Sequence, residues 1–450
     1  MRIKVLSRSE TANTRSRRDD SLLLQRNLDP VFKPLQAQRE YVRALKAAKL
    51  SRLFAKPFVG ALEGHTDGIA CMATSSRNLA ALLSGSSNGE LVLWDLAEKR
   101  CVGAAAQAHR GSVRGVAVCA EGREAVSVGD DKMARLWTLQ GGDAAPMQHV
   151  RAVFEAARPL LGCDCSWQDD AVFATCGDDV SLWDTARAQP VHAFSWGSDA
   201  VLAVKFNPAE PWLLASVGGS DRSVALYDSR QAVALRKLVM AMRSNQVAWN
   251  PMEPMCFTVA NEDGSLYSFD MRNLDAARNV HADHVAAVMD VSFSPSGREF
   301  VSASYDRSVR IFSTRGDAGR SREVYTAPRM QRVFACRFTM DARFIASGSE
   351  DTIVRLWKAE AARPLGIVSA RQERALRYGD KLVERYSAVG EVRKIAKGRR
   401  LPKLIFKERQ ARNEQAAAAR RKQGRVAAHS RPGSARQPPL RERHLVQTME

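Results

Sequence analysis

Short apolar runs that contain an aromatic residue near their end recur along the chain between residues 91 and 358. Examples are Leu91 to Asp95 (LVLWD) and Val354 to Lys358 (VRLWK), and such compact runs are typical of buried β-strands. The aromatic residues lie 42 to 46 positions apart and are Trp94, Trp137, Trp183, Tyr227, Phe269, Phe312 and Trp357. Seven near-equal units of this length predict an all-β ring of seven four-stranded sheets.

A second pattern precedes the aromatic residues. The first unit has Asn88 six positions before its tryptophan. Five other units have an aspartate at this offset, namely Asp131, Asp221, Asp263, Asp306 and Asp351. A carboxylate there stabilises a tight turn because it accepts backbone N–H bonds. Gly64-His65 and Ala108-His109 lie upstream, with the histidines 29 and 28 positions before their tryptophans. These spacings match the G-H…W-D signature of WD40 repeats and predict a seven-bladed WD40 β-propeller.

Closure of the ring requires one more strand. An open seam would expose a strand edge, so a segment flanking the repeats must pair there. Residues 57–62 before the first unit and residues 364–369 after the last unit are both strand-like. We expect the N-terminal segment to complete the last blade.

The second unit contains the residue types of a hydrolase triad. His109, Ser127 and Asp131 occur there, and His284, Ser302 and Asp306 repeat the set in the sixth unit. A nucleophile is needed once, whereas a hydrogen-bond network that pins a blade is useful in every blade. We therefore interpret the recurring residues as structural: His65, His109, Ser127, Asp131, Trp137, Asp221, Asp263, His284, Asp306 and Asp351. No nucleotide-binding, metalloprotease, esterase or kinase motif occurs, so we expect no enzyme activity, no cofactor, no metal and no small-molecule substrate.

Charge is unevenly distributed along the chain and divides it into three regions. The chain has 68 Lys and Arg against 49 Asp and Glu, a net charge of +19. Residues 371–450 have a net charge of +14 and residues 1–56 of +9, which leaves −4 for residues 57–370. The sequence thus predicts a basic N-terminal arm (1–56), a mildly acidic propeller (57–370) and a basic C-terminal domain (371–450). A polyanion should meet the two arms first.

The compartment follows from what the composition excludes. Residues 1–10 contain no apolar signal region, and no stretch of 18 apolar residues occurs. We therefore expect neither secretion nor a membrane. Eight cysteines without a C-x-x-C pair indicate neither a disulfide framework nor a zinc site, and favour a reducing intracellular compartment.

The N-terminal arm contains a predicted helix before the first blade. Tyr41, Leu45 and Ala48 share one face that can dock. The residues that then point outward are Arg39, Arg43 and Lys46.

The C-terminal domain contains two predicted helices of different character. Leu376, Leu382, Val383 and Tyr386 form an apolar stripe that can pack on the propeller, with Gly379 as a point of interruption. Residues 405–422 are strong helix formers with almost no apolar face. Such a helix is stabilised by water and side-chain pairs, or by lying along a partner. Beyond Pro432 the composition indicates an extended tail.

RNA is the partner that these exposed cations favour. The alternative is a solvated charged helix without a ligand. The residues predicted to contact RNA are Arg39, Arg43, Lys46, Arg393, Lys394, Lys397, Arg399, Arg400, Lys403, Lys407, Arg409, Arg412, Arg420, Arg421 and Lys422. The basic runs 393–400 and 420–425 also suit nuclear import, a use compatible with RNA binding.

Several short motifs resemble the Sof family of nucleolar WD40 proteins, components of the small-subunit processome. In the N-terminal part they are RNLDP (26–30), REYVRAL (39–45) and FAKPF (54–58), followed by GHTDG (64–68). After the propeller, RKIA (393–396), RLPKLI (400–405) and HSRPGS (429–434) are similar to the Sof-like domain. Lys46 and the run 397–400 depart from the family pattern but keep or raise the positive charge.

The resemblance implies a non-enzymatic assembly factor of the small ribosomal subunit. Its expected partners are pre-rRNA, small nucleolar RNA and other processome proteins, and its expected location is the nucleus and nucleolus. The propeller would bind neighbouring proteins while the basic arms hold RNA.

A different function is suggested at the ends of the fourth and fifth units. Asp228 and Arg230, then Asp270 and Arg272, repeat a D-x-R spacing after the aromatic residue. Similar motifs in substrate receptors of the cullin-four ubiquitin ligase contact its adaptor, and some Sof-family members are assigned that role. An arginine there can offer a bidentate fork to an acidic partner. The alternative is that each aspartate caps a turn and pairs with its own arginine.

Overall fold

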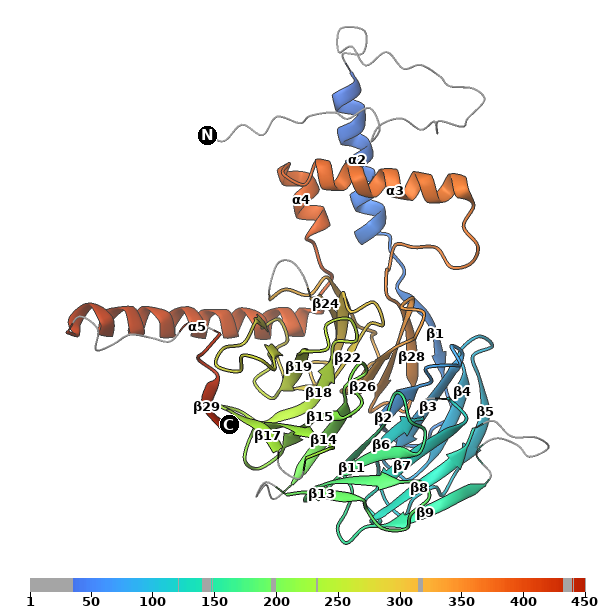
Figure 1. The fold of residues 1–450 in the computed structure, drawn as a ribbon. Coiled ribbons are helices and arrows are strands. Elements are labelled where there is room, and N and C mark those ends of the chain that lie inside the picture. Colours follow the sequence, from blue (N-terminus) through green and yellow to red (C-terminus); the bar gives the residue numbers. More distant parts are fainter. Residues whose placement is uncertain are drawn as a thin grey trace. The chain divides into compact units, whose positions relative to one another are not determined.

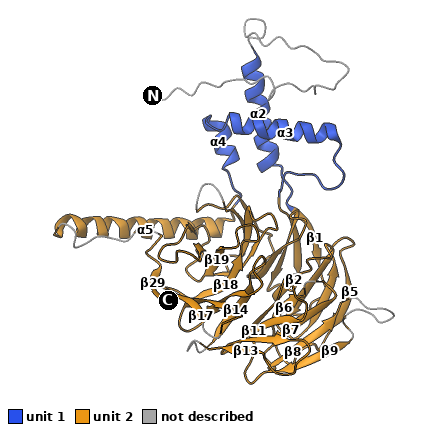
Figure 2. Cartoon of the chain, viewed as in Figure 1, with its two compact units in different colours: residues 1–57, 360–400 blue, residues 58–359, 401–450 orange. Residues whose placement is uncertain are grey.

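The computed structural model describes residues 35–119, 121–139, 147, 149–195, 200–231, 234–314, 319–431, 439 and 441–449. Two compact units divide the chain, one from residues 1–57 and 360–400 and the other from residues 58–359 and 401–450 (Figure 2). This division differs from the three parts expected from charge, because the C-terminal domain is split between the two units. The RNLDP motif (26–30) and residues 432–434 of HSRPGS lie outside the described residues.

Seven antiparallel sheets, counted within the described residues, form the ring of the second unit (Figure 1). The innermost strands are β2 (Ile69–Thr74), β6 (Val113–Val118), β10 (Gly162–Cys165), β14 (Val201–Phe206), β18 (Ser244–Trp249), β22 (Val288–Phe293) and β26 (Val333–Phe338). The second strands are β3 (Ala81–Ser86), β7 (Glu124–Gly129), β11 (Val172–Cys176), β15 (Leu213–Gly218), β19 (Cys256–Asn261), β23 (Glu299–Ser304) and β27 (Phe344–Ser349). The third strands are β4 (Leu91–Asp95), β8 (Met133–Thr138), β12 (Val180–Asp184), β16 (Ser223–Asp228), β20 (Leu266–Asp270), β24 (Val309–Ser313) and β28 (Val354–Lys358). The outer strands are β5 (Arg100–Ala105), β9 (Val150–Glu155), β13 (His192–Phe194), β17 (Ala234–Met240), β21 (Asn279–His281), β25 (Glu323–Tyr325) and β1 (Phe58–Leu62). The seven-bladed propeller predicted from the aromatic period is therefore confirmed.

The N-terminal segment closes the ring, as expected. β1 pairs antiparallel with β28, with Leu62 opposite Val354 and Phe58 opposite Trp357. The Phe58 ring also meets the Trp357 ring edge-on, with centroids 5.5 Å apart. Because β1 comes from the start of the propeller and β28 from its end, the two ends of the ring are joined in one sheet.

The core lies between neighbouring blades. The aromatic residue of each third strand is buried, and the Trp94 side chain is 2% exposed. Trp94 packs in one cluster with Leu62 and Leu356 of the last blade and Ile69 and Leu82 of the first. Each sheet thus buries its apolar faces against the next sheet, which is how stacked repeats obtain a continuous core.

Three helices, in the described residues, make up the first unit: α2 (Gln36–Arg52), α3 (Ala370–Arg385) and α4 (Gly390–Ala396). Ala44 and Ala48 of α2 are fully buried against Leu382, Tyr386 and Val392. Leu382 and Tyr386 of the α3 stripe, which the sequence assigned to propeller packing, are therefore buried against α2, whereas Leu376 is exposed. Small alanines allow this close approach between helices.

Two details of the helical predictions were wrong. The most buried face of α2 contains Glu40, Ala44 and Ala48, while Leu45 is only half-buried. Glu40 is held there by Arg385 at 3.6 Å and by the Tyr386 hydroxyl at 3.4 Å, so a buried carboxylate occupies a place that an apolar pattern does not reveal. α3 also continues without a break through Gly379.

The rest of the C-terminal segment belongs to the propeller unit. α5 (Lys403–His429) is a 27-residue helix, and β29 (Leu445–Met449) pairs with β17 as a fifth strand of the fourth blade. Gln447 lies opposite Val239, and Met449 lies opposite Lys237. The sequence predicted only an extended tail here, because a strand without a turn signal whose partner lies 200 positions away leaves no local pattern.

Replacement of Leu62 by Ala tests the closure. Leu62 is 1% exposed, so removal of its side chain should lower the free energy of unfolding by about 2–4 kcal/mol. Ala61→Ser, at an exposed position of the same strand, should change it by less than about 0.5 kcal/mol. Urea unfolding of both variants provides the measurement, and equal midpoints would show that β1 does not close the ring.

Candidate functional site

A buried histidine network occupies the second blade. His109 Nε2 lies 2.7 Å from Ser127 Oγ, and His109 Nδ1 lies 2.9 Å from Asp131. Trp137 Nε1 donates to the same Ser127 Oγ at 2.8 Å. Burial lowers the pKa of His109, although its hydrogen bond to Asp131 acts in the opposite direction. The serine hydroxyl is thus enclosed by the tryptophan and the histidine.

The sixth and first blades repeat this arrangement with variations. His284 lies 2.6 Å from Ser302 Oγ and 2.9 Å from Asp306. In the first blade, His65 Nε2 lies 2.6 Å from Ser84 Oγ, and its Nδ1 faces Glu90 at 3.6 Å. Glu90 therefore takes the place of the aspartate that this blade lacks. Recurrence of one geometry in separate blades fits a structural role.

The remaining aspartates of the pattern cap turns and hold neighbouring side chains. Asp221 accepts from Ser223 at 2.6 Å and pairs with Lys237 at 2.7 Å. Asp263 accepts from the backbone N–H of Ser265 at 2.7 Å, and Asp351 pairs with Arg355. These contacts lie within the blades and fit a structural role for the three aspartates.

His281 lies at the end of β21, the outer strand of the fifth blade, and has a different environment from the network histidines. It is 2% exposed, and its ring packs edge-on to Phe300 and Phe312 with centroids 5.0 and 5.3 Å away. Its Nε2 has no hydrogen-bond partner among the described residues. Burial lowers the pKa of His281 to about 4.

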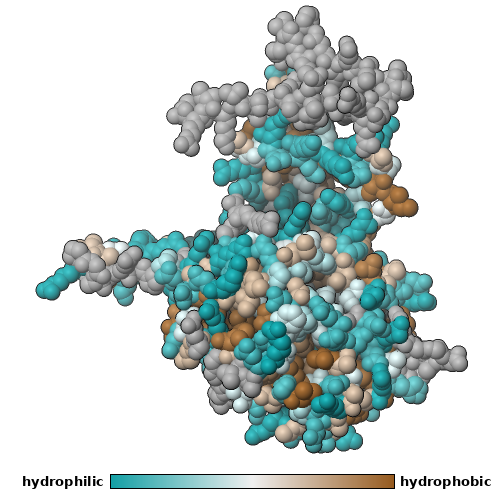
Figure 3. Space-filling view, viewed as in Figure 1, coloured by the Kyte–Doolittle hydropathy of each residue, from teal (hydrophilic) through white to brown (hydrophobic). Residues whose placement is uncertain are grey.

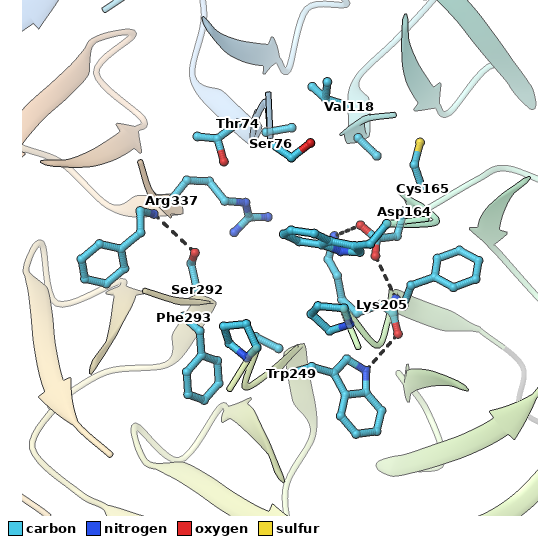
Figure 4. Close-up of a pocket in the computed structure, with 18 of the residues that line it drawn as sticks. Thr74, Ser76, Val118, Asp164, Cys165, Lys205, Trp249, Ser292, Phe293 and Arg337 are labelled. Atoms are coloured by element: carbon cyan, nitrogen blue, oxygen red, sulfur yellow. Dashed lines mark hydrogen bonds and ion pairs between the residues drawn. The ribbon is translucent and has the colours of Figure 1, made fainter. Parts of the chain in front are cut away.

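The innermost strands line two pockets at the centre of the ring, and two ion pairs lie among the residues that line them. Figure 4 shows the first of these pairs, Lys205 with Asp164. Lys205 Nζ lies 2.7 Å from Asp164, and Arg337 Nη1 lies 2.6 Å from Asp290. In both pairs the acid belongs to the preceding blade, Asp164 to the third and Asp290 to the sixth. No group of three metal-ligating residues occurs in the part of the chain that the structure describes.

The predicted RNA contacts of the first unit lie at its surface. Arg39, Arg43 and Lys46 are exposed along α2, away from the buried Ala44 and Ala48. At α4 and the segment after it, the exposed members of the predicted set are Arg393, Lys394, Lys397 and Arg400, while Arg399 is half-buried. The unit thus has cations on two of its segments.

α5 separates the remaining predicted cations into two groups. Lys403, Lys407, Arg420, Arg421 and Lys422 are exposed. Arg409 Nη2 instead lies 2.9 Å from the buried carboxylate of Asp283, and Arg412 donates to the carbonyls of His284 and Asp263 at 2.8 and 2.5 Å. The sequence placed these two arginines on RNA, but the structure has them on the propeller. The far half of α5 extends beyond the ring and has a largely hydrophilic surface (Figures 1 and 3).

The D-x-R residues form local pairs at the ends of β16 and β20. Arg230 donates through Nε and Nη2 to Asp228 at 3.1 and 2.9 Å, and its guanidinium stacks on Trp212, 4.6 Å from the ring centroid. Arg272 donates to Asp270 at 3.0 and 2.7 Å. Both arginine side chains are more than 60% exposed. Hydrogen bonding to the arginine lowers the pKa of the Asp228 and Asp270 carboxyls. Because each arginine uses Nε and Nη2 for its aspartate, its Nη1 lies on the opposite side of the guanidinium.

Comparison with known proteins identifies the family. A family model described as "Sof1-like domain" matches residues 359–445. A second model, described as "WD domain, G-beta repeat", matches residues 56–95, 100–138, 188–228, 278–313 and 320–358. The protein named DDB1- and CUL4-associated factor 13 of Danio rerio is 43% identical over 451 residues, covering both chains completely. Its namesake in Homo sapiens is 42% identical over 446 residues, 99% of each chain. The chain belongs to the Sof1 family of WD40 proteins.

The family assignment confirms the resemblance drawn from the short motifs. A relative of the same name in Dictyostelium discoideum is 43% identical over 418 residues, 92% of each chain. Residues 139–187 and 229–277 lie between the repeat matches, yet they contain β9 to β12 and β17 to β20. The aromatic period predicted these blades because Trp183 and Phe269 keep their spacing.

Sequence reasoning missed Asp283 and His444. Asp283 is an acid directly before His284, where the first two blades have Gly64 and Ala108, and this departure from the repeat was the available signal. His444 lies in a tail without periodicity, so no sequence signal pointed to it.

Among the helices of the described ranges, none has the length and apolar character that a membrane span requires.

The pKa of His281 predicts an acid-sensitive stability. In the unfolded chain the imidazole binds a proton as the pH falls below about 6.5, whereas the buried ring stays neutral until about pH 4. Stability present at neutral pH is therefore lost as the pH falls, by about 2 kcal/mol at pH 5 from this group. His281→Phe should remove that part of the loss, as measured by urea unfolding at pH 7 and pH 5. His192→Phe, at an exposed position of β13, should keep the wild-type dependence. An unchanged loss in His281→Phe would contradict the assignment.

Proposed function

We propose that this chain is a non-enzymatic assembly factor of the small ribosomal subunit, acting in the small-subunit processome in the nucleolus. Membership of the Sof1 family supports this direction. In the proposed arrangement the propeller binds neighbouring proteins, and the basic segments bind pre-rRNA and small nucleolar RNA. The exposed basic runs 393–400 and 420–425 would serve nuclear import.

The far half of α5 is the observation that carries the RNA-binding proposal. From Asn413 to His429 every residue of the helix is exposed, and the only acid among them is Glu414. Arg420, Arg421, Lys422 and Arg425 lie within two turns near its end. A helix without an apolar face has no core to join, and closely spaced cations attract phosphates through the release of counterions.

The ring itself offers less to RNA. The cations of the central cavity are paired with Asp164 and Asp290, and the surface arginines of the blades largely pair with nearby acids, as Arg114 does with Asp130 at 2.8 Å. Exposed pairs of this kind present little net charge. We therefore place the RNA contacts on α5 and on the cations of α2 and α4.

Binding of the full-length chain to single-stranded RNA tests the proposal. With about 8 phosphates neutralised, log K should fall against log salt with a slope near −6. The triple variant Arg420→Ala, Arg421→Ala, Lys422→Ala should reduce the slope to about −4 and weaken binding about a hundredfold at ~0.1 M salt.

The matched control removes three positive charges from the blades. Arg100→Ala, Arg123→Ala and Arg151→Ala delete exposed arginines that pair with Glu98, Glu121 and Glu124. This variant should bind RNA with nearly the wild-type slope. Equal losses in both triple variants would show that net charge, and not α5, determines the binding, and a flat salt response would exclude a phosphate-dominated interface.

A second candidate function is that of a substrate receptor in a cullin-four ligase. The relatives are named for association with DDB1 and CUL4, and Arg230 and Arg272 support this role for the present chain. Asp228 and Trp212 hold Arg230 in one orientation, so little side-chain entropy remains to be lost when Nη1 meets a partner. Local pairing with the aspartate and contact with an adaptor are thus compatible.

The double variant Arg230→Ala, Arg272→Ala tests this candidate. It should weaken capture of DDB1 by roughly tenfold or more, because exposed arginines with oriented donors are frequent binding hot spots. Small-subunit rRNA maturation should continue. Arg187→Ala is a matched control, since Arg187 follows Asp184 of the third blade with a different spacing and lies 3.8 Å from it. Unchanged capture by the double variant would remove the role.

A further inference from the structure

Asp283 is a buried carboxylate that the repeat pattern does not require. It stands directly before His284, and its side chain is fully buried. Arg310, also fully buried, lies 3.0 Å from its Oδ2, and the backbone N–H of Ser321 donates to the same oxygen at 3.2 Å. Oδ1 receives a different partner, Arg409 of α5, at 2.9 Å. A residue 126 positions away thus completes the shell of this carboxylate.

A second arginine of α5, Arg412, contacts the propeller about one turn further along the helix. Arg412 Nη1 donates to the carbonyl of His284, and Nη2 donates to the carbonyl of Asp263. Gly264 lies beside them with a φ of +80°, and a Cβ there would stand 3.0 Å from Arg412 Nη1. Glycine therefore satisfies the turn and leaves room for the guanidinium. The two carbonyls that accept from Arg412 come from neighbouring blades, the fifth and the sixth.

The chain after α5 returns to the same region. β29 pairs with β17, and the backbone N–H of Ala241 donates to the carbonyl of His444 at 2.9 Å. The His444 ring packs on Tyr267 with centroids 5.0 Å apart, and its Nδ1 lies 3.7 Å from the Asp263 carboxylate. Asp263 thus contacts the chain on both sides of the far part of α5: its carbonyl accepts from Arg412, and its carboxylate lies near His444.

We propose that Asp283, Arg409, Arg412 and β29 form a clasp whose role is to fix the direction of α5. Asp283 is the positioning residue of this clasp. The idea deepens the proposed function, since it rests on α5 being the RNA-binding arm. It also assigns Arg409 and Arg412 to the root of the arm, and Arg420, Arg421 and Lys422 to its RNA-binding tip.

The physical reason is the composition of α5. Ile405 is its one buried side chain among the described residues, so apolar packing cannot fix the helix. Arg409 forms an ion pair with a buried acid, and Arg412 donates charge-assisted hydrogen bonds to two carbonyls. Two such directional contacts, about one turn apart, define an axis for the helix. A fixed arm meets RNA with less orientational entropy to lose than a freely moving one.

The clasp can be tested by the distribution of distances between two spin labels, one on the propeller and one on α5, because a fixed helix gives a narrow distribution. Cys101 on β5 is the one exposed cysteine of the eight, and burial raises the pKa of the half-buried Cys71 thiol to about 12, which protects it from labelling. Nitroxides on Cys101 and on an added cysteine, Ala416→Cys, report the position of α5 relative to the propeller by pulsed electron spin resonance. The full-length chain should give one narrow distribution. Arg409→Ala with Arg412→Ala should broaden it roughly twofold or more, because the helix then moves on a flexible connection.

Two variants separate positioning from general stability. Lys407→Ala removes an exposed cation from the same part of α5 and should leave the distribution narrow. Arg409→Lys keeps a cation opposite Asp283 and should broaden it less than Arg409→Ala. Asp283→Asn also removes a partner of the buried Arg310, so the arginine variants, which leave the Asp283–Arg310 pair intact, are the primary test. A broad wild-type distribution, or a narrow one in the double variant, overturns the clasp.

Failure of the clasp is distinguishable from failure of RNA binding. If the tip variants lose RNA and the root variants leave the spin-label distribution unchanged, RNA binding stands and the clasp is rejected. If the root variants broaden the distribution while wild-type chain shows no salt-dependent RNA binding, the clasp stands and the RNA-binding function is rejected.

Discussion

Burial between neighbouring sheets is the constraint on which the structure depends. A four-stranded blade has two apolar faces and cannot cover them alone, so each blade needs a neighbour on both sides. Trp94 shows the consequence, because it packs against residues of the last blade as well as its own. Burial of a side chain of this size contributes about 4–6 kcal/mol as an upper bound. The same need explains why the first strand of the ring pairs with its last blade.

Polar residues inside the ring follow from this burial. A tryptophan N–H that leaves water must find an acceptor, and Ser127 and Ser84 provide it in their blades. The histidines bond to these hydroxyls, and the acids lie on the other side of the histidine rings. Once such a network recurs, a single departure from it gains significance. Asp283 is such a departure, and its second oxygen receives an arginine from outside the ring.

α5 illustrates the opposite situation. The helix has a sequence that favours helical backbone but no apolar face, so contacts at its root decide where it lies. The ring provides these contacts where the fifth and sixth blades meet, and the strand after α5 adds to the outer edge of the fourth blade. A mildly acidic ring with a basic arm is compatible with the proposed function, in which the propeller binds proteins and the arm binds RNA.

Spacing and composition along the chain were enough to predict the propeller, its seven blades, its turn-capping aspartates and the helical, basic character of the arms. These features are repeated or local, so spacing between residues such as Trp94 and Trp137 is enough to reveal them. Three features depend on contacts made after folding: α2 packs with α3, Arg409 and Arg412 lie on the propeller, and residues 445–449 form a strand. Each of these contacts joins segments more than 100 residues apart and occurs once. Its partner is selected by the shape and charge of an assembled surface, which no periodicity along the chain encodes.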